Sequence, residues 1–117
     1  LLLRRVQEMS KLEELITELC PFGVEYKTLG EIGIDFYRGS GISKDQLRNN
    51  GIPCVRYGEI YTTYNIYFDK CTSFTDKNLI QNKKYFHRGD ILFAITGENV
   101  EEISKSCVYI GNEECLG

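Results

Sequence analysis

The side chains with the clearest chemical potential lie in the middle of the chain, where cations and tyrosines are interleaved. Residues 36–90 carry nine basic and five acidic groups, whereas the net charge is −3 over residues 1–35 and −4 over residues 91–117. Six of the eight tyrosines fall in this basic middle: Tyr37, Tyr57, Tyr61, Tyr64, Tyr67 and Tyr85. Lys and Arg can hold phosphates, and Tyr offers a hydroxyl and a ring to sugars and bases. The same pattern also suits a solvated face with half-buried tyrosines, and the overall charge of −3 argues mildly against a nucleic-acid partner.

The other reactive side chains form no catalytic or metal-binding pattern. His87 is the single histidine and lacks partners at ligand spacing, which favours a surface or structural role. The five cysteines include no C-x-x-C pair and suit scattered thiols in a reducing cytoplasm. The adjacent carboxylates at 101–102 and 113–114 point in different directions, so neither pair suits acid–base catalysis. No apolar run is long enough to span a membrane. We therefore expect no catalytic residues, no metal site and no enzyme activity of its own.

One helix is expected near the start of the chain. Leu12, Leu15, Ile16 and Leu19 form an apolar stripe at helical spacing, which predicts a core or an interface rather than a site. Ser10 and Glu13 have the spacing of a capping box, so the helix should begin at Ser10 and end in the Cys-Pro-Phe-Gly segment at 20–23. Met9 could be the natural start, with residues 1–8 an upstream extension, or these residues could lengthen the helix.

Most of the remaining chain is expected to form strands. The continuous apolar run 91–95 predicts a central buried strand, and Thr75 predicts the start of a short helix over 76–80. Arg38 to Gly41 should form a flexible turn. Further strands are predicted over 24–29, 32–37, 53–57, 61–68 and 106–110. The layout predicts an α+β fold with an amino-terminal helix, short helices and a mostly antiparallel, twisted sheet. We divide the chain into an extension and helix over 1–23 and a single domain over 24–117.

Ordered motif blocks carry a family resemblance. These are residues 38–44 (RGSGISK), 51–62 (GIPCVRYGEIYT), 88–98 (RGDILFAITGE) and 102–105 (EISK), preceded by an opening over 9–32. The series resembles the specificity subunit of type I restriction-modification systems over nearly the whole chain. Family members often have Ser where Thr96 stands. The resemblance covers a truncated amino-terminal target recognition domain, without the spacer helices and the second recognition domain.

The resemblance implies a DNA reader rather than a catalyst. Such a domain reads one half of a bipartite site in double-stranded DNA, in the cytoplasm of a bacterium or archaeon. Its expected partners are a methyltransferase (modification) subunit and a restriction subunit. Those subunits would bring S-adenosylmethionine, ATP and Mg, and this chain would bind no cofactor. A homo-oligomer is possible, and no membrane partner is expected.

Candidate DNA-binding residues follow from the two kinds of contact that reading requires, to phosphates and to base edges. The phosphate candidates are Arg38, Lys44, Lys83 and Lys84, and Arg38 and Lys44 flank a glycine loop. Ser40 of this loop is a further DNA-binding candidate. The base-edge candidates are Arg56, Tyr57, Glu59, Tyr61 and Thr62. A third contact is expected from the loop containing Thr96, Glu98 and Asn99. Arg56 and Glu59 could instead form an ion pair that orients the strand.

Two other classes of function stay open. The truncated domain could be a protein-interaction or self-associating module that reads no DNA, because its apolar stripe and an incomplete sheet both favour association. It could also be an unrelated α+β binding module that uses tyrosines for carbohydrate. The second alternative predicts no salt-dependent binding of duplex DNA.

Overall fold

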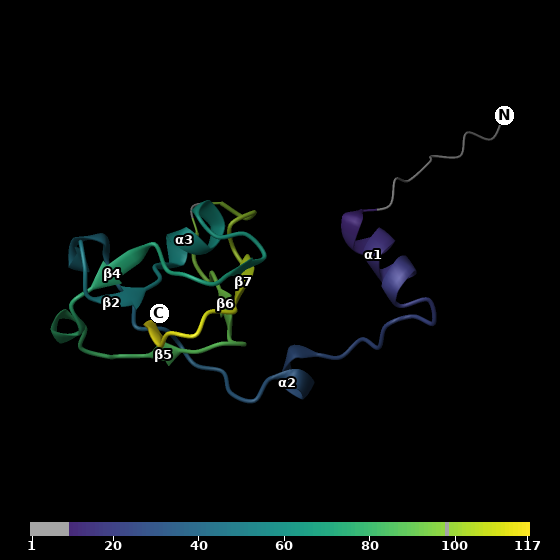
Figure 1. Ribbon diagram of the computed structural model, residues 1–117, viewed down its shortest axis with the longest axis horizontal. Coiled ribbons are helices and arrows are strands. Elements are labelled where there is room, and N and C mark those ends of the chain that lie inside the picture. The colour runs from purple at the N-terminus through teal and green to yellow at the C-terminus, as the bar shows by residue number, and fades with distance from the viewer. Residues whose placement is uncertain (1–9, 98) are drawn as a thin grey trace. The chain divides into compact units, whose positions relative to one another are not determined.

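The computed structural model describes residues 10–97 and 99–117, and these divide into two compact units (Figure 1). The first unit extends to Phe36 and the second comprises Tyr37–Gly117. We had placed the division at 23/24. Met9 and residues 1–8, which bear on the start of the first helix, lie outside the described residues. No helix in the described part of the chain is long and apolar enough to cross a membrane.

The first unit contains helix α1 (Lys11–Leu19) and the short helix α2 (Leu29–Ile32). The predicted capping box of α1 is confirmed, since the Ser10 N–H donates to Glu13 Oε2 at 2.9 Å and the Glu13 N–H donates to Ser10 Oγ at 3.2 Å. The strands predicted over 24–29 and 32–37 are wrong. Thr28 and Glu31 form a second capping box that starts α2, and no described strand pairs with either segment.

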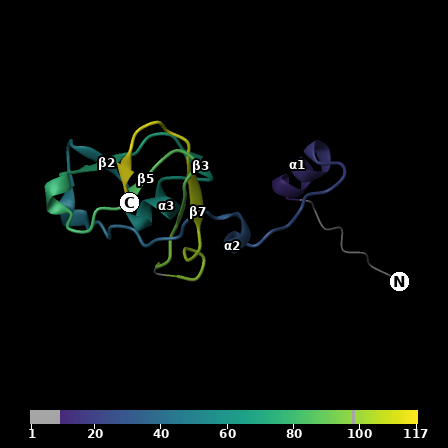
Figure 2. The same ribbon diagram turned by 90° about the horizontal axis from the view of Figure 1, so that it is seen from below.

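The second unit is built on two small sheets (Figures 1 and 2). The five-stranded sheet has the order β1-β4-β2-β8-β5, in which only the β2–β8 pairing is parallel. Its strands are β1 (Leu47–Arg48), β2 (Ile52–Cys54), β4 (Ser73–Thr75), β5 (Tyr85–Phe86) and β8 (Cys115–Leu116). Two short 3-10 helices adjoin these strands. Helix η1 (Lys44–Gln46) precedes β1, and η2 (Lys77–Leu79) follows β4. The cap of η2 is Asp76 rather than the predicted Thr75.

The three-stranded sheet has the order β3-β7-β6. Its strands are β3 (Tyr67–Phe68), β6 (Ile91–Phe93) and β7 (Ser106–Tyr109), with β6–β7 antiparallel and β3–β7 parallel. Four of the six described pairings over the two sheets are therefore antiparallel, and the predicted α+β class is confirmed. The prediction of a central buried strand over 91–95 is wrong, because β6 lies at an edge of this sheet and Ile91 is 49% exposed.

Strand β8 joins the two parts of the hydrophobic core. Its residues Cys115 and Leu116 are both fully buried, and consecutive side chains of a strand point to opposite faces. Cys115 packs in one cluster with Phe68, Phe86 and Tyr109. Leu116 packs in the other cluster, which is formed with Ile42, Cys54 and Ile80. The carboxyl-terminal strand is thus a structural centre of this unit.

The strands predicted over 53–57 and 61–68 are confirmed in part, since β2 overlaps the first and β3 lies within the second. Helix α3 (Tyr57–Thr62) stands in place of strand at 57 and 61–62. The Glu59 carboxylate turns back to accept the Arg56 N–H at 2.7 Å, which stabilises the first turn of the helix. Ile60 is buried on the inner side of α3 and packs in the same cluster as Phe68. Local capping and one buried contact therefore outweigh the strand preference of the Tyr- and Thr-rich sequence.

Candidate nucleic-acid interface

The glycine loop over 38–41 is bound to the segment that leads into β5. Ser40 Oγ accepts the Lys84 N–H at 2.7 Å and donates to the Lys84 carbonyl at 3.3 Å. The Tyr37 hydroxyl donates to the Tyr85 carbonyl at 2.5 Å, and the Ser40 N–H donates to the Gly117 carbonyl. A Cβ at Gly39 would lie 2.8 Å from that carbonyl oxygen, so the close approach requires glycine. Ser40, a predicted DNA contact, thus anchors the loop.

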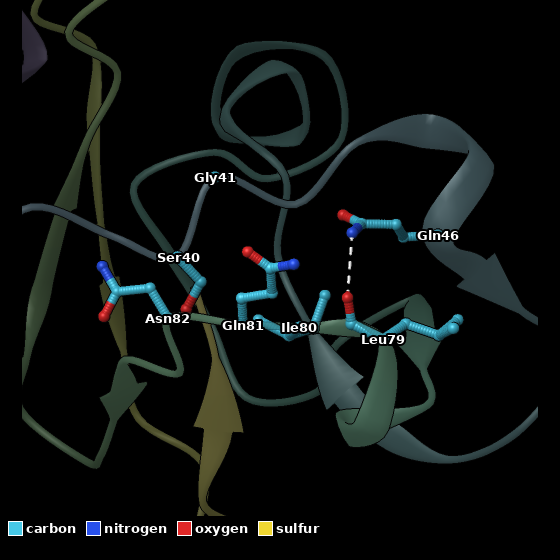
Figure 3. Close-up of a pocket in the computed structure, with 7 residues that line it drawn as sticks. All are labelled: Ser40, Gly41, Gln46, Leu79, Ile80, Gln81 and Asn82. Carbon is cyan, nitrogen blue, oxygen red and sulfur yellow. Dashed lines mark hydrogen bonds between the residues drawn. The ribbon is translucent and has the colours of Figure 1, made fainter.

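A polar hollow of about 290 Å³ lies beside this junction (Figure 3). We call it the first hollow, and its lining residues are Ser40, Gly41, Gln46, Leu79, Ile80, Gln81 and Asn82. The Gln46 amide is fully engaged, because its Nε2 donates to the Leu79 carbonyl at 3.1 Å and its Oε1 accepts the Ser43 N–H at 2.9 Å. These bonds join η1 to η2 and fix one wall of the hollow.

The four cationic phosphate candidates gather around the first hollow. Arg38, Lys44, Lys83 and Lys84 each lie within two residues of a residue that lines it. Lys84 is held through its main chain, which leaves its ammonium group out of those bonds. Lys83 Nζ donates to the Ile80 carbonyl at 2.9 Å. Residues from two segments that are distant in the sequence therefore meet at one place.

A second hollow of about 620 Å³ lies between segments 48–52 and 75–77. Its lining residues are Arg48, Asn49, Asn50, Gly51, Ile52, Thr75, Asp76 and Lys77. It adds two cations that the sequence analysis did not select, Arg48 and Lys77. The six cations of both hollows form what we call the basic rim: Arg38, Lys44, Arg48, Lys77, Lys83 and Lys84.

The basic rim carries little opposing charge. Segments 38–52 and 75–84 contain these six cations and only Asp45 and Asp76, a net charge of +4, so the remaining residues carry −7. No rim cation forms a salt bridge with a described carboxylate. The Asp76 carboxylate accepts the Asn78 N–H at 2.9 Å, and a hydrogen bond from Ser43 holds the pKa of Asp45 below its usual value. An acidic protein thus presents a local cationic surface, which resolves the objection raised by its net charge.

The base-edge candidates lie on α3, apart from Arg56, which precedes the helix as its N-cap residue. Helix α3 contacts β6 and β7 of the three-stranded sheet. Glu59 accepts hydrogen bonds from Ser73 Oγ and from Thr72 Oγ1, the latter at 3.4 Å, as well as from the Arg56 N–H. The carboxylate therefore ties α3 to the start of β4. Within the described chain no salt bridge joins Arg56 and Glu59, so the two residues meet through the backbone rather than as the ion pair we considered.

The other α3 candidates differ in how far they are available to a ligand. Tyr57 is 50% exposed, and its ring centroid lies 6.4 Å from that of Tyr61. The Thr62 hydroxyl donates to the Gly58 carbonyl at 2.8 Å, and it is exposed. The Nε of Arg56 is buried and has no hydrogen-bond partner among the described residues.

The third predicted contact, the loop after β6, is described only in part. Glu98 lies outside the described residues. The Asn99 amide is engaged with Glu102, accepting its N–H at 3.1 Å and donating to its carboxylate at 3.1 Å. Thr96 is exposed. This loop has its own hydrogen bonds and lines neither hollow.

The thiols and the histidine take structural positions. All five cysteines are free thiols, and burial raises the pKa of Cys54 to about 11. His87 Nε2 lies 2.7 Å from a Glu114 carboxylate oxygen, and the His87 N–H donates to Asp90 at 2.8 Å. Across the residues that the structure describes, no three His, Cys, Asp or Glu side chains form a group that could hold a metal ion.

The sequence analysis missed four of the residues most relevant to this surface: Arg48, Lys77, Gln81 and Asn82. The signal that could have found them is the amide-rich composition of the two segments, which also contain Asn49, Asn50 and Asn78.

No family model, curated protein or solved structure matches this chain.

Proposed function

We propose that this chain is a double-stranded DNA-recognition module, the target-reading part of a type I restriction-modification specificity subunit. The observation that carries the proposal is the basic rim, where segments 38–52 and 75–84 meet around the two hollows. The ordered motif blocks support the family assignment. Under this proposal the chain works in the cytoplasm, and partner subunits supply methyl transfer and ATP-driven cleavage.

The chemistry of the surface suits a duplex. Six cations without a described acidic partner can each displace a counterion from a phosphate, which drives association and makes it salt-dependent. Amide side chains between those cations can reach base edges while the cations hold the register. Anchoring through Ser40 and Gln46 fixes the loops before DNA arrives, so less conformational entropy is lost on binding.

Helix α3 has a secondary place in this proposal. Tyr57, Tyr61, Thr62 and Arg56 stay predicted contacts, as do Thr96 and Asn99. Glu59 is better explained as a positioning residue, because its carboxylate already accepts hydrogen bonds from three groups of the chain. A carboxylate so engaged would have to give up these bonds to accept from a cytosine amine.

Selection from a randomised duplex library tests the proposal. The 117-residue chain is incubated with duplexes that contain a randomised centre, and the bound molecules are sequenced after each round. We expect one shared short motif, and a Lys44→Ala/Lys84→Ala variant should enrich the same motif at lower salt. Lys70→Ala/Lys105→Ala is the matched control, since both lysines are exposed and line neither hollow. A bound pool without a shared motif, or no bound pool, would contradict the proposal.

Self-association is the second candidate function, and one observation favours it. Large apolar side chains are exposed in the first unit, among them Leu12, Leu19, Phe22 and Ile34. Contiguous exposed apolar surface commonly marks an interface, and a second copy of the chain is the occupant we propose. Light scattering over a range of protein concentrations tests this. A strict monomer that also binds duplex DNA would remove this candidate.

A further inference from the structure

We infer that Gln81 and Asn82 read an adenine in the major groove of the bound duplex. The inference rests on the proposed function and names the base that this site recognises. Both side chains line the first hollow and are exposed. Neither amide forms a hydrogen bond with another described residue. The Gln46 amide in the same hollow, by contrast, donates to the Leu79 carbonyl (Figure 3) and accepts the Ser43 N–H.

The two amides stand on a short segment that is fixed on both sides. On one side Ile80 is buried in the core and its carbonyl accepts Lys83 Nζ at 2.9 Å. On the other side the Lys84 N–H donates to Ser40 Oγ at 2.7 Å, and the Lys84 carbonyl accepts the Gly117 N–H at 3.1 Å. The backbone that presents the amides is therefore held in place before a ligand binds, which suits a specific contact.

The hydrogen-bond donors and acceptors of the Gln81 and Asn82 carboxamides favour adenine over the other bases. A carboxamide carries one acceptor and two donors, which match the N6 amino group and N7 of adenine along its major-groove edge. A guanine presents two acceptors there and is better matched by Arg or Lys. Lys83 and Lys84 follow Asn82 directly in sequence, so phosphate contacts can hold the duplex where an adjacent amide meets a base.

The test begins with the motif that the wild-type chain selects from the randomised library. Each adenine of that motif is replaced in turn by 7-deaza-adenine, in which a C–H stands where N7 accepts a hydrogen bond. At one position we expect wild-type affinity to fall roughly 2- to 10-fold, as for loss of one of the two hydrogen bonds of a bidentate contact. A Gln81→Ala/Asn82→Ala variant should lose its preference at that position and become insensitive to the 7-deaza substitution.

Controls separate this inference from the proposed function. The double variant should bind random-sequence duplex as tightly as the wild type, because its cations are intact, and Asn112→Ala should change neither affinity nor preference. A motif without adenine, full tolerance of 7-deaza-adenine by the wild type, or an unchanged preference in the double variant overturns the inference alone. If the wild type binds no duplex, the proposed function itself fails.

Discussion

Removing lysines from the basic rim should weaken DNA binding and also make it less dependent on salt. Each cation that neutralises one phosphate contributes about 0.9 to the magnitude of the slope of log affinity against log salt concentration, so six rim cations give a slope of about −5.4. Affinity should then fall about 1,800-fold between 50 and 200 mM salt. Replacing both Lys44 and Lys84 by Ala should bring the slope to about −3.6 and reduce this loss to about 150-fold.

These substitutions should leave the fold intact. Lys44 is exposed, and Lys84 contributes its main-chain N–H and carbonyl to the junction with Ser40, which alanine retains. The matched control is a Lys70→Ala/Lys105→Ala variant, which has the same net charge and changes exposed lysines that line neither hollow. Because the two variants have the same net charge, any difference in their DNA affinity reports the position of the replaced lysines rather than the total charge.

Fluorescence anisotropy of a labelled duplex measures the slope directly. The titration is repeated on the selected motif and on a scrambled duplex, because loss of a phosphate contact should weaken both by the same factor. Equal slopes for the rim variant and the control variant would refute the assignment of the rim. So would a loss of affinity confined to one of the two sequences.

Four further predictions concern the fold that holds this surface. Glu59→Ala should lower the free energy of unfolding by about 2–3 kcal/mol in urea titrations, since hydrogen bonds to a half-buried carboxylate are lost; a change below about 0.5 kcal/mol would contradict its positioning role. Gly51→Ala should destabilise the protein strongly, because Gly51 has φ +133° and its Cβ would lie 2.3 Å from the Thr75 carbonyl oxygen. Gly58→Ala, within α3, should instead raise the melting temperature through a gain of about 0.5–1 kcal/mol. Between pH 9 and 11 the Cys54 thiol should lower the free energy of unfolding by up to about 1.4 kcal/mol per pH unit, because it ionises in the unfolded chain near its usual pKa of 9.0 but in the folded chain only at about 11. Burial also raises the pKa of Cys107 to about 11, so that thiol should add a similar contribution. Cys54→Ala should lose only the first contribution in urea titrations over this pH range.

Structure that depends on neighbouring residues could be predicted from the sequence. Ser10 and Glu13 are three residues apart, so their capping box and the start of α1 follow from local spacing alone. The α+β class followed from one helical stripe and several short apolar runs. The resemblance of the motif blocks to a specificity subunit also needs only the order of residues.

Long-range pairing decided what local patterns could not. The run 91–95 is apolar enough for a central strand, but its place at a sheet edge depends on which strands pair with β7. Residues 57–62 have strand-forming side chains, yet a cap by Glu59 and burial of Ile60 make them helical. In both cases the deciding contacts include groups distant in sequence, such as Ser73 for Glu59.

The basic, tyrosine-rich middle of the chain could be recognised in the sequence. Which of its residues meet on one surface could not. Residue types alone determined that cations outnumber carboxylates there. Only tertiary structure brought segment 38–52 against segment 75–84 and exposed the amides of Gln81 and Asn82 between the lysines. The physical reason is that charge and hydrogen-bonding capacity belong to single residues, whereas a binding surface requires backbone hydrogen bonds and buried contacts between distant parts of the chain.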